Sequence, residues 1–328
     1  MGCRPRGPSA EASSPRRIQF SSLPLLFLFF GSTSSQSPGE VPTGVKEFQP
    51  GVSIDWTHKT VEVGAKVVLK GGSIELLACS ARTKEHESIL VVKPRPLHVM
   101  QAMGLVGLEP GSPTRFDAEK QQGTVPTGER LSLFVRFRDG DVEYTAPVEY
   151  WLREVKSGKS ADPLPWVYSG SRNLGDGRFA ADVDGTVAAV VDFSTSLISI
   201  GALHSADNEG LWLEANTEAI PPIGTDCTLL IRGEKISRKV VRLTLDVEGK
   251  PRLGELSLSM EQVLNRLKEP PADGSATSLE VDAGASAPAH IASFVRSLVE
   301  SGIDRRRIEI RPQRITGPHR KAATVPED

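Results

Sequence analysis

The chain has 328 residues, of which 38% are hydrophobic and 24% charged, and its formal net charge is −2. This length accommodates two domains with separate apolar cores, and the composition is that of a globular protein rather than a membrane or fully disordered one. A dedicated nucleic-acid binder needs an excess of basic residues to neutralise phosphates. The near-neutral charge therefore argues against nucleic acid as the partner.

The first 37 residues have the layout of a secretory signal peptide. Four arginines precede an apolar run at residues 23–30 (LPLLFLFF), and small or polar residues follow at 31–37. These are the three parts of such a signal. The run is shorter than the roughly 20 apolar residues that span a bilayer. We therefore expect cleavage, with an uncleaved anchor as the alternative, and no transmembrane span in the mature chain. The expected location is the periplasm or another extracytoplasmic compartment.

Period-two alternation predicts a first domain at residues 48–202, after a Pro- and Gly-rich linker at 38–47. Expected strands lie at 52–56, 60–63, 66–69, 74–79, 89–92, 131–137, 142–146, 178–183 and 186–191. Asp139-Gly140 and Asp184-Gly185 predict hairpin turns between their flanking strands. Helical spacing predicts one main helix at 97–108. The fold class is therefore α+β, and this domain is expected to be mainly an antiparallel sheet with one main helix.

A second, smaller domain is predicted at residues 224–315, after a linker at 203–223 and before a tail at 316–328. Expected strands lie at 226–231, 241–247, 278–281 and 307–311, and a turn at 248–250 leads into 252–256. Expected helices lie at 260–267 and 288–302. Ser259 and Ser286 are the expected helix N-caps. The β-β-α-β-α-β order predicts helices packed on one face of a small sheet.

The first domain resembles the YdjY domain, a bacterial family. The resemblance rests on stretches at residues 51–56 (GVSIDW), 74–80 (IELLACS), 84–89 (KEHESI), 126–128 (PTG), 166–171 (WVYSGS) and 191–193 (VDF). The family brings no established activity, so the resemblance implies a domain type and no reaction.

The second domain is similar in patterning to the periplasmic domain of ExbD/TolR-type proteins, which work in energy transduction across the bacterial envelope. The matching stretches are residues 256–267, 279–282 and 288–303. That family normally has a transmembrane helix with an acidic residue that takes part in proton-driven action, and no such segment precedes this domain. The resemblance therefore implies docking onto an envelope protein partner, without motor coupling.

The densest polar group of the first domain is Cys79, Lys84, His86 and Glu87. If the chain turns back after Cys79, His86 could take the thiol proton and create a thiolate nucleophile. Cys79, His86 and Glu87 could instead ligate zinc or another transition metal. The plainer interpretation is a buried Cys79 in the core, with Lys84 and Glu87 forming an ion pair.

A second candidate group for ligand binding is Trp166, Tyr168, Ser169 and Ser171, together with Lys84. The Ser-Gly-Ser turn could offer backbone N–H groups to an anion, and the aromatic rings could form the floor of a cleft. Simple anchoring of a loop on the sheet is the alternative. Asp182 and Asp184 could likewise assist a cation site or serve only the turn.

These observations lead to three hypotheses for function. We expect an exported ligand-binding or protein-assembly module without enzyme activity and without a cofactor. The alternatives are a thiol- or metal-dependent enzyme using Cys79, His86 and Glu87, and an accessory of an energy-transducing envelope complex. The sequence has no Gly-rich phosphate loop, paired-His metal motif, CxxC or GxSxG. Cys79 and Cys227 are open to a disulfide or to two core thiols.

Overall fold

The computed structural model describes residues 44–117, 119, 122–207, 210–234, 239–268 and 277–314. All of them belong to one compact unit, residues 41–328. The expected signal peptide at 1–37 and tail at 316–328 lie outside the described residues. In the described part of the chain, none of the helices combines the length and the apolar character needed to cross a membrane.

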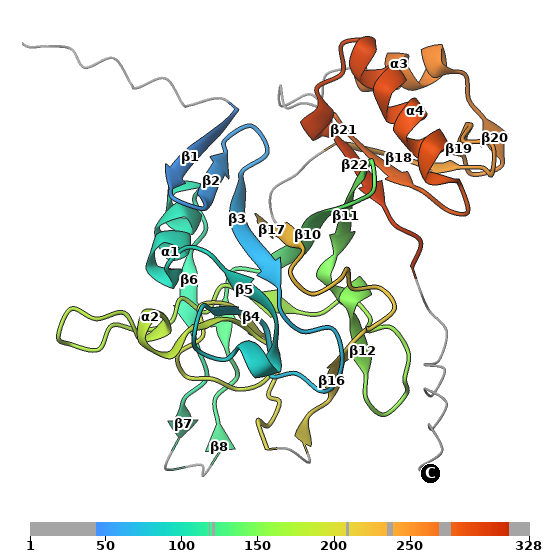
Figure 1. Cartoon of the computed structure of the whole chain (residues 1–328). Helices are drawn as coiled ribbons and strands as arrows, with labels where there is room; N and C mark the ends of the chain where they lie inside the picture. Colours follow the sequence, from blue (N-terminus) through green and yellow to red (C-terminus); the bar gives the residue numbers. More distant parts are fainter. Residues whose placement is uncertain are drawn as a thin grey trace, which may run out of the picture. The chain divides into compact units, whose positions relative to one another are not determined.

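The fold is α+β and consists mostly of strands in one large mixed sheet (Figure 1). The sheet order is β14-β4-β5-β3-β17-β10-β11-β22-β21-β18-β19-β20, and β1 pairs with β2, which pairs with β3. Its N-terminal strands are β1 (Val45–Gln49), β2 (Val52–Asp55), β3 (Thr60–Val67), β4 (Leu76–Ser80), β5 (Ser88–Val92), β10 (Leu131–Asp139), β11 (Val142–Pro147), β14 (Thr186–Ala189) and β17 (Asp226–Gly233). Its C-terminal strands are β18 (Val240–Leu245), β19 (Pro251–Leu253), β20 (Leu256–Ser257), β21 (Ser278–Asp282) and β22 (Ile308–Arg311).

Shorter elements complete the described structure. Two-stranded sheets pair β6 (Pro110–Ser112) with β9 (Thr127–Gly128), β7 (Phe116–Asp117) with β8 (Gln122–Gly123), β12 (Leu152–Glu154) with β16 (Leu213–Ala215), and β13 (Trp166–Val167) with β15 (Ser199–Ile200). The helices are α1 (Pro96–Leu105), α2 (Ala180–Asp184), α3 (Met260–Lys268) and α4 (Pro288–Glu300).

Strand β10 shows how the sequence pattern produces the sheet. Its alternate residues Leu131, Leu133, Val135 and Phe137 are buried, because successive side chains of a strand point to opposite faces. The expected hairpin at Asp139-Gly140 is confirmed: β10 and β11 pair antiparallel, and Gly140 adopts φ 56° in the turn.

The strand expected to open the second domain belongs instead to the first. β17 pairs antiparallel with β3 on one side and with β10 on the other. Its consecutive apolar residues Leu229, Leu230 and Ile231 are fully buried, so both faces of this central strand are covered. The expected linkers are also structured in part. β1 begins at Val45, inside the expected linker at 38–47, and the segment expected as a linker at 203–223 contributes β16 and the fully buried Asn216.

The expected hairpin at Asp184-Gly185 is wrong. The preceding residues form helix α2, and Gly185, with φ 78°, is its left-handed C-cap, whose N–H bonds to the carbonyl of Ala181.

Asp182 on helix α2 stabilises the N-terminus of α1. Its Oδ1 accepts the Leu97 N–H at 2.9 Å, and its Oδ2 accepts from Arg95. A carboxylate at a helix N-terminus satisfies a free donor and complements the helix dipole.

The C-terminal strands β18, β21 and β22 are mutually parallel and are connected through α3 and α4. Right-handed crossovers between neighbouring parallel strands place both helices on one face of the sheet. The expected cap at Ser259 is confirmed, since its Oγ accepts the Gln262 N–H at 3.2 Å and Gln262 Oε1 accepts the Ser259 N–H at 2.9 Å. Ser286 is not the cap of α4, because Ala287 occupies that position and the buried Ser286 Oγ has no partner among the described residues.

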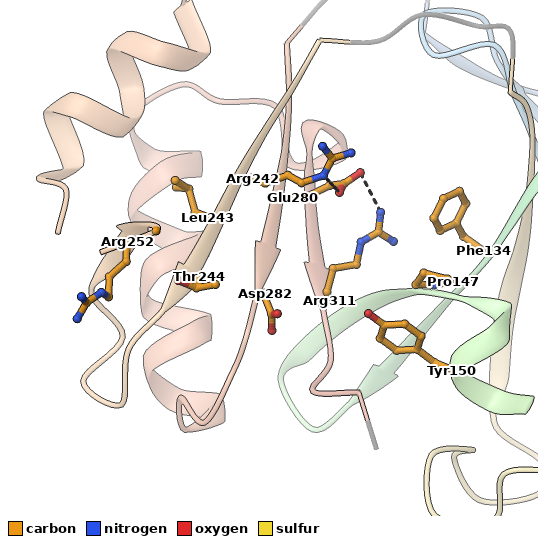
Figure 2. Close-up of a pocket in the computed structure, with 11 residues that line it drawn as sticks. Phe134, Pro147, Tyr150, Arg242, Leu243, Thr244, Arg252, Glu280, Asp282 and Arg311 are labelled. Carbon is orange, nitrogen blue, oxygen red and sulfur yellow. Dashed lines mark hydrogen bonds and ion pairs between the residues drawn. The ribbon is translucent and has the colours of Figure 1, made fainter. Parts of the chain in front are cut away.

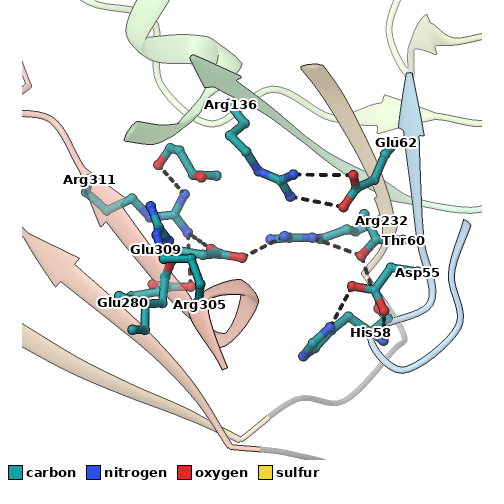
Figure 3. Close-up of polar contacts among 12 residues, drawn as sticks. Asp55, His58, Thr60, Glu62, Arg136, Arg232, Glu280, Arg305, Glu309 and Arg311 are labelled. Atoms are coloured by element: carbon teal, nitrogen blue, oxygen red, sulfur yellow. Dashed lines mark hydrogen bonds and ion pairs between the residues drawn. The ribbon is translucent and has the colours of Figure 1, made fainter. Parts of the chain in front are cut away.

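The C-terminal strands join the first sheet through one parallel pair, Tyr144 opposite Ile310. Charged side chains reinforce this joint (Figure 3). Glu309 Oε1 accepts from Arg232 at 2.6 Å and its Oε2 accepts from Arg311 at 2.9 Å. Both guanidinium groups lie over the ring of Phe134, each 4.7 Å from its centroid. The joint therefore depends on buried charge pairs as well as on strand pairing.

Candidate functional site

Cys79 is a buried core cysteine. It lies in β4, opposite Thr186 of β14 and Val91 of β5, and its side chain is fully buried. Burial raises the pKa of the thiol and outweighs hydrogen bonds from Ser88 and Thr83. A thiol in this environment is a poor nucleophile, because only the thiolate reacts readily.

His86 does not share the environment of Cys79. Its side chain is 79% exposed on the short 3₁₀ turn Glu85–Glu87, and its Nε2 lies 3.6 Å from Glu87 Oε2. Among the residues that the structure describes, no three His, Cys, Asp or Glu side chains form a group able to hold a metal ion. The structure thus supplies no zinc site from Cys79, His86 and Glu87. Cys79 and Cys227 are both free and buried.

The polar atoms of the 166–171 stretch are used to hold its own loop. Trp166 Nε1 donates to Glu149 Oε1 at 3.0 Å, and the Tyr168 hydroxyl donates to the Met100 carbonyl at 3.3 Å. Ser169 Oγ bonds to the Ser196 carbonyl, while Ser171 Oγ donates to the Thr195 carbonyl. These side chains anchor the loop on the sheet, which is the plainer of the two expectations.

Lys84 and Glu87 do form the expected ion pair, with Nζ and Oε1 3.3 Å apart, and the structure adds residues from two other segments to them. Lys84 Nζ lies 4.6 Å from the centroid of the Phe193 ring, and Glu75 is close enough to Glu87 for the two carboxyl groups to interact electrostatically. Burial, and then the charge of Glu87, raise the pKa of Glu75. The three stretches 74–80, 84–89 and 191–193 therefore meet in one half-buried polar cluster.

Asp184 is the anionic neighbour of this cluster. Its Oδ2 accepts from the hydroxyls of Thr186 and Thr195, at 2.6 and 2.5 Å. Burial opposes ionisation, but the two hydroxyls and the charge of Lys84 outweigh it and lower the pKa of Asp184. Asp184 is therefore a fixed carboxylate: its partners among the described residues hold Oδ2, and Oδ1 can accept from another donor.

A hollow of about 630 Å³ lies beside Asp184 and Phe193. Its walls come from the β6–β7 segment, the loop before α2, and the loop after β14. They include Thr114, Arg115, Phe116, Arg172, Leu174, Asp184, Asp192, Phe193, Ser194 and Thr195. The hollow thus brings together hydroxyls, two carboxylates, two guanidinium groups and two aromatic rings. Its volume is in the range of small-molecule sites, about 300–1,000 Å³.

A second cavity, of about 490 Å³, lies at the joint with the C-terminal strands (Figure 2). Its arginines already have acidic partners. Arg242 and Arg311 contact Glu280 at 3.1 and 3.0 Å, and Arg252 contacts Glu255. Since its charges are compensated internally, this cavity is the weaker candidate for binding.

The sequence did not single out most of the residues around the hollow. Asp192 and Phe193 of its wall, and Glu75 of the adjacent polar cluster, fall within the quoted YdjY stretches, so those stretches carried the signal. Arg115, Phe116 and Arg172 lie in loops and short strands without a motif, and no sequence signal marks them.

The family comparison identifies the domain type of the N-terminal part of the chain. The model of the YdjY domain matches residues 52–232, which include the central strand β17. No curated protein and no solved structure matches the chain. Since the matched region is more than half of the chain, the protein belongs to the YdjY domain family.

Proposed function

We propose that the protein is an exported binding module of the cell envelope, without enzyme activity, whose ligand occupies the hollow beside Asp184 and Phe193. The observation that carries this proposal is the convergence of the YdjY stretches on a polar cluster that contacts Asp184 and Phe193, two residues that line the hollow. Hydroxyls and carboxylates there are held in place by neighbouring residues, as pre-organised binding sites require. The buried, weakly acidic Cys79 offers no support for thiol chemistry.

The proposal assigns separate roles to the two parts of the chain. The signal-like N-terminus supports export into the periplasm or an equivalent compartment. The YdjY domain would bind the ligand. The C-terminal part, with its patterning similar to ExbD/TolR-type periplasmic domains, would dock onto an envelope protein partner. No metal and no cofactor enter this proposal.

The binding function is tested with the dialysable fraction of an envelope extract from the producing cells. A ligand that binds only the folded state stabilises it by about 2.7 kcal/mol at one hundred times its Kd. We expect this fraction to raise the unfolding temperature of the mature protein, and the rise to disappear in Asp184→Asn. Asp162→Asn, at an exposed residue that does not line the hollow, is the matched control and should keep the effect. An extract that leaves the unfolding temperature unchanged would contradict the proposal.

A further inference from the structure

We infer that the hollow binds a saccharide that carries a carboxylate group. This inference rests on the proposed binding function and names the chemical class of its ligand. It is carried by three features of the hollow: two guanidinium groups, a pair of partly engaged carboxylates with neighbouring hydroxyls, and an exposed aromatic ring.

The guanidinium groups of Arg115 and Arg172 indicate an anionic group on the ligand. Both residues are exposed and line the same hollow. Within the described ranges, neither side chain forms an ion pair or a hydrogen bond, whereas the nearby Arg95 and Arg178 are paired with Asp182 and Asp176. Guanidinium binds a carboxylate through two parallel hydrogen bonds. Arg115 and Arg172 are therefore available to hold one.

Asp184 and Asp192 require that the same ligand also carries hydroxyl groups. Asp184 uses Oδ2 for its two threonine partners, and Asp192 uses Oδ2 to accept the His204 N–H at 3.0 Å. In the part of the chain that the structure describes, no donor bonds to either Oδ1 atom, so both can accept from ligand O–H groups. A purely anionic ligand would meet like charge here, which is unfavourable. A polyhydroxylated ligand instead donates to both carboxylates and bonds with the hydroxyl of Ser194 in the wall.

Phe116 supplies the apolar surface that a sugar ring needs. It lies on β7 and is 69% exposed, although it is a large apolar residue at the rim of a polar hollow. The C–H face of a pyranose ring is apolar, so it can cover such a ring and remove it from water. The combination of carboxylate, hydroxyls and an apolar face is the chemistry of an acidic sugar.

The test measures binding to the full mature chain by isothermal titration calorimetry. Trigalacturonate and N-acetylmuramate are the two carboxylated sugars, which differ in where the carboxylate is attached. Maltotriose lacks the carboxylate, and tricarballylate lacks the hydroxyl-bearing ring. We expect at least one carboxylated sugar to bind, and both comparison compounds to bind at least tenfold more weakly.

Variants separate the contributions of the wall. Arg115→Ala and Arg172→Ala should each weaken binding of the acidic sugar about tenfold, which corresponds to about 1.4 kcal/mol. Phe116→Ala should weaken the sugar and leave tricarballylate unchanged. Arg296→Ala on α4 and the exposed Ile223→Ala, which do not line the hollow, are the matched controls and should bind normally.

Three results would overturn the inference. Maltotriose that binds as tightly as the carboxylated sugars would show that the site does not recognise a carboxylate. Tricarballylate that binds as tightly as the sugars would show a plain anion site, and failure of both carboxylated sugars would exclude this ligand class. The unfolding-temperature experiment with the envelope extract distinguishes a wrong ligand class from a wrong binding function. If the extract still stabilises the protein while both sugars fail, only the ligand class is wrong. If neither has an effect, the binding function is wrong as well.

Discussion

Replacing Glu309 by glutamine removes the carboxylate that links two buried arginines at the joint with β22. The Glu309 side chain is 6% exposed, and its two oxygens contact Arg232 and Arg311 at 2.6 and 2.9 Å. Removal of one partner of a buried ion pair costs about 3–5 kcal/mol, because the remaining charge is left uncompensated. Arg311 keeps Glu280 at 3.0 Å and Arg232 keeps Thr60. We therefore expect a loss at the lower end, about 3 kcal/mol.

Urea unfolding measures this loss in two ways. With a denaturant slope of about 3 kcal/mol per M, the midpoint should fall by about 1 M. The four tryptophans lie between residues 56 and 212, so their fluorescence follows the YdjY domain, whereas far-ultraviolet circular dichroism also follows the C-terminal helices. A midpoint that falls further by circular dichroism than by fluorescence would place the weakening in the C-terminal part.

Glu255→Gln is the matched control, because it makes the same chemical change at an exposed glutamate that contacts Arg252. Exposed ion pairs contribute little, so its midpoint should not move measurably. Equal midpoints for Glu309→Gln and the unsubstituted protein would refute the reasoning that buried charge pairs stabilise the joint.

Three further predictions concern the YdjY domain. Burial raises the pKa of both Cys79 and Cys227, the latter to about 12, so thiol reagents at pH 7 should label them only as fast as the protein unfolds. Peptide mass analysis checks this, and rapid labelling of Cys79 would contradict it. Trp166→Phe removes the indole donor to the buried Glu149, which still accepts the Leu164 N–H. We therefore expect the free energy of unfolding in urea to fall by about 1 kcal/mol. An unchanged midpoint would count against this hydrogen bond. Burial lowers the pKa of His204 below its usual 6.5, so as the pH falls the unfolded chain takes up a proton before the folded protein does. The free energy of unfolding that depends on a neutral His204 is therefore present above pH 6.5 and is lost as the pH falls through the folded pKa. His204→Gln should therefore flatten the loss of stability below pH 6.5, and an identical pH profile would argue against the shift.

Local sequence patterns predicted elements whose causes are local. The alternation of β10 and the Asp139-Gly140 turn define a hairpin within residues 131–147, and the structure confirms it. Asp184-Gly185 misled the same reasoning, because a glycine with positive φ ends a helix as readily as it turns a hairpin. Helix α2 is only one turn long, so it shows no helical spacing of apolar residues. The sequence therefore cannot distinguish a helix end from a hairpin turn at this glycine.

The sequence patterns did not predict which residues from distant parts of the chain lie close together. Cys79 and His86 are seven positions apart, yet one is buried in a strand and the other points into solvent. Conversely, Arg115, Arg172 and Thr195 come from separate loops and line the same hollow. Side-chain periodicity fixes which face of an element is buried, but not which distant loops come together on it.

The central position of β17 has a consequence for how the chain reaches its native state. β17 separates β3 from β10, so the two halves of the YdjY sheet have no direct strand pairing until it is inserted between them. A nascent chain that has been synthesised only to residue 202 therefore exposes two unpaired strand edges, which favour aggregation. Pairings between strands so far apart in sequence also form slowly. The protein is thus expected to depend on a holding chaperone until the segment through residue 233 has emerged.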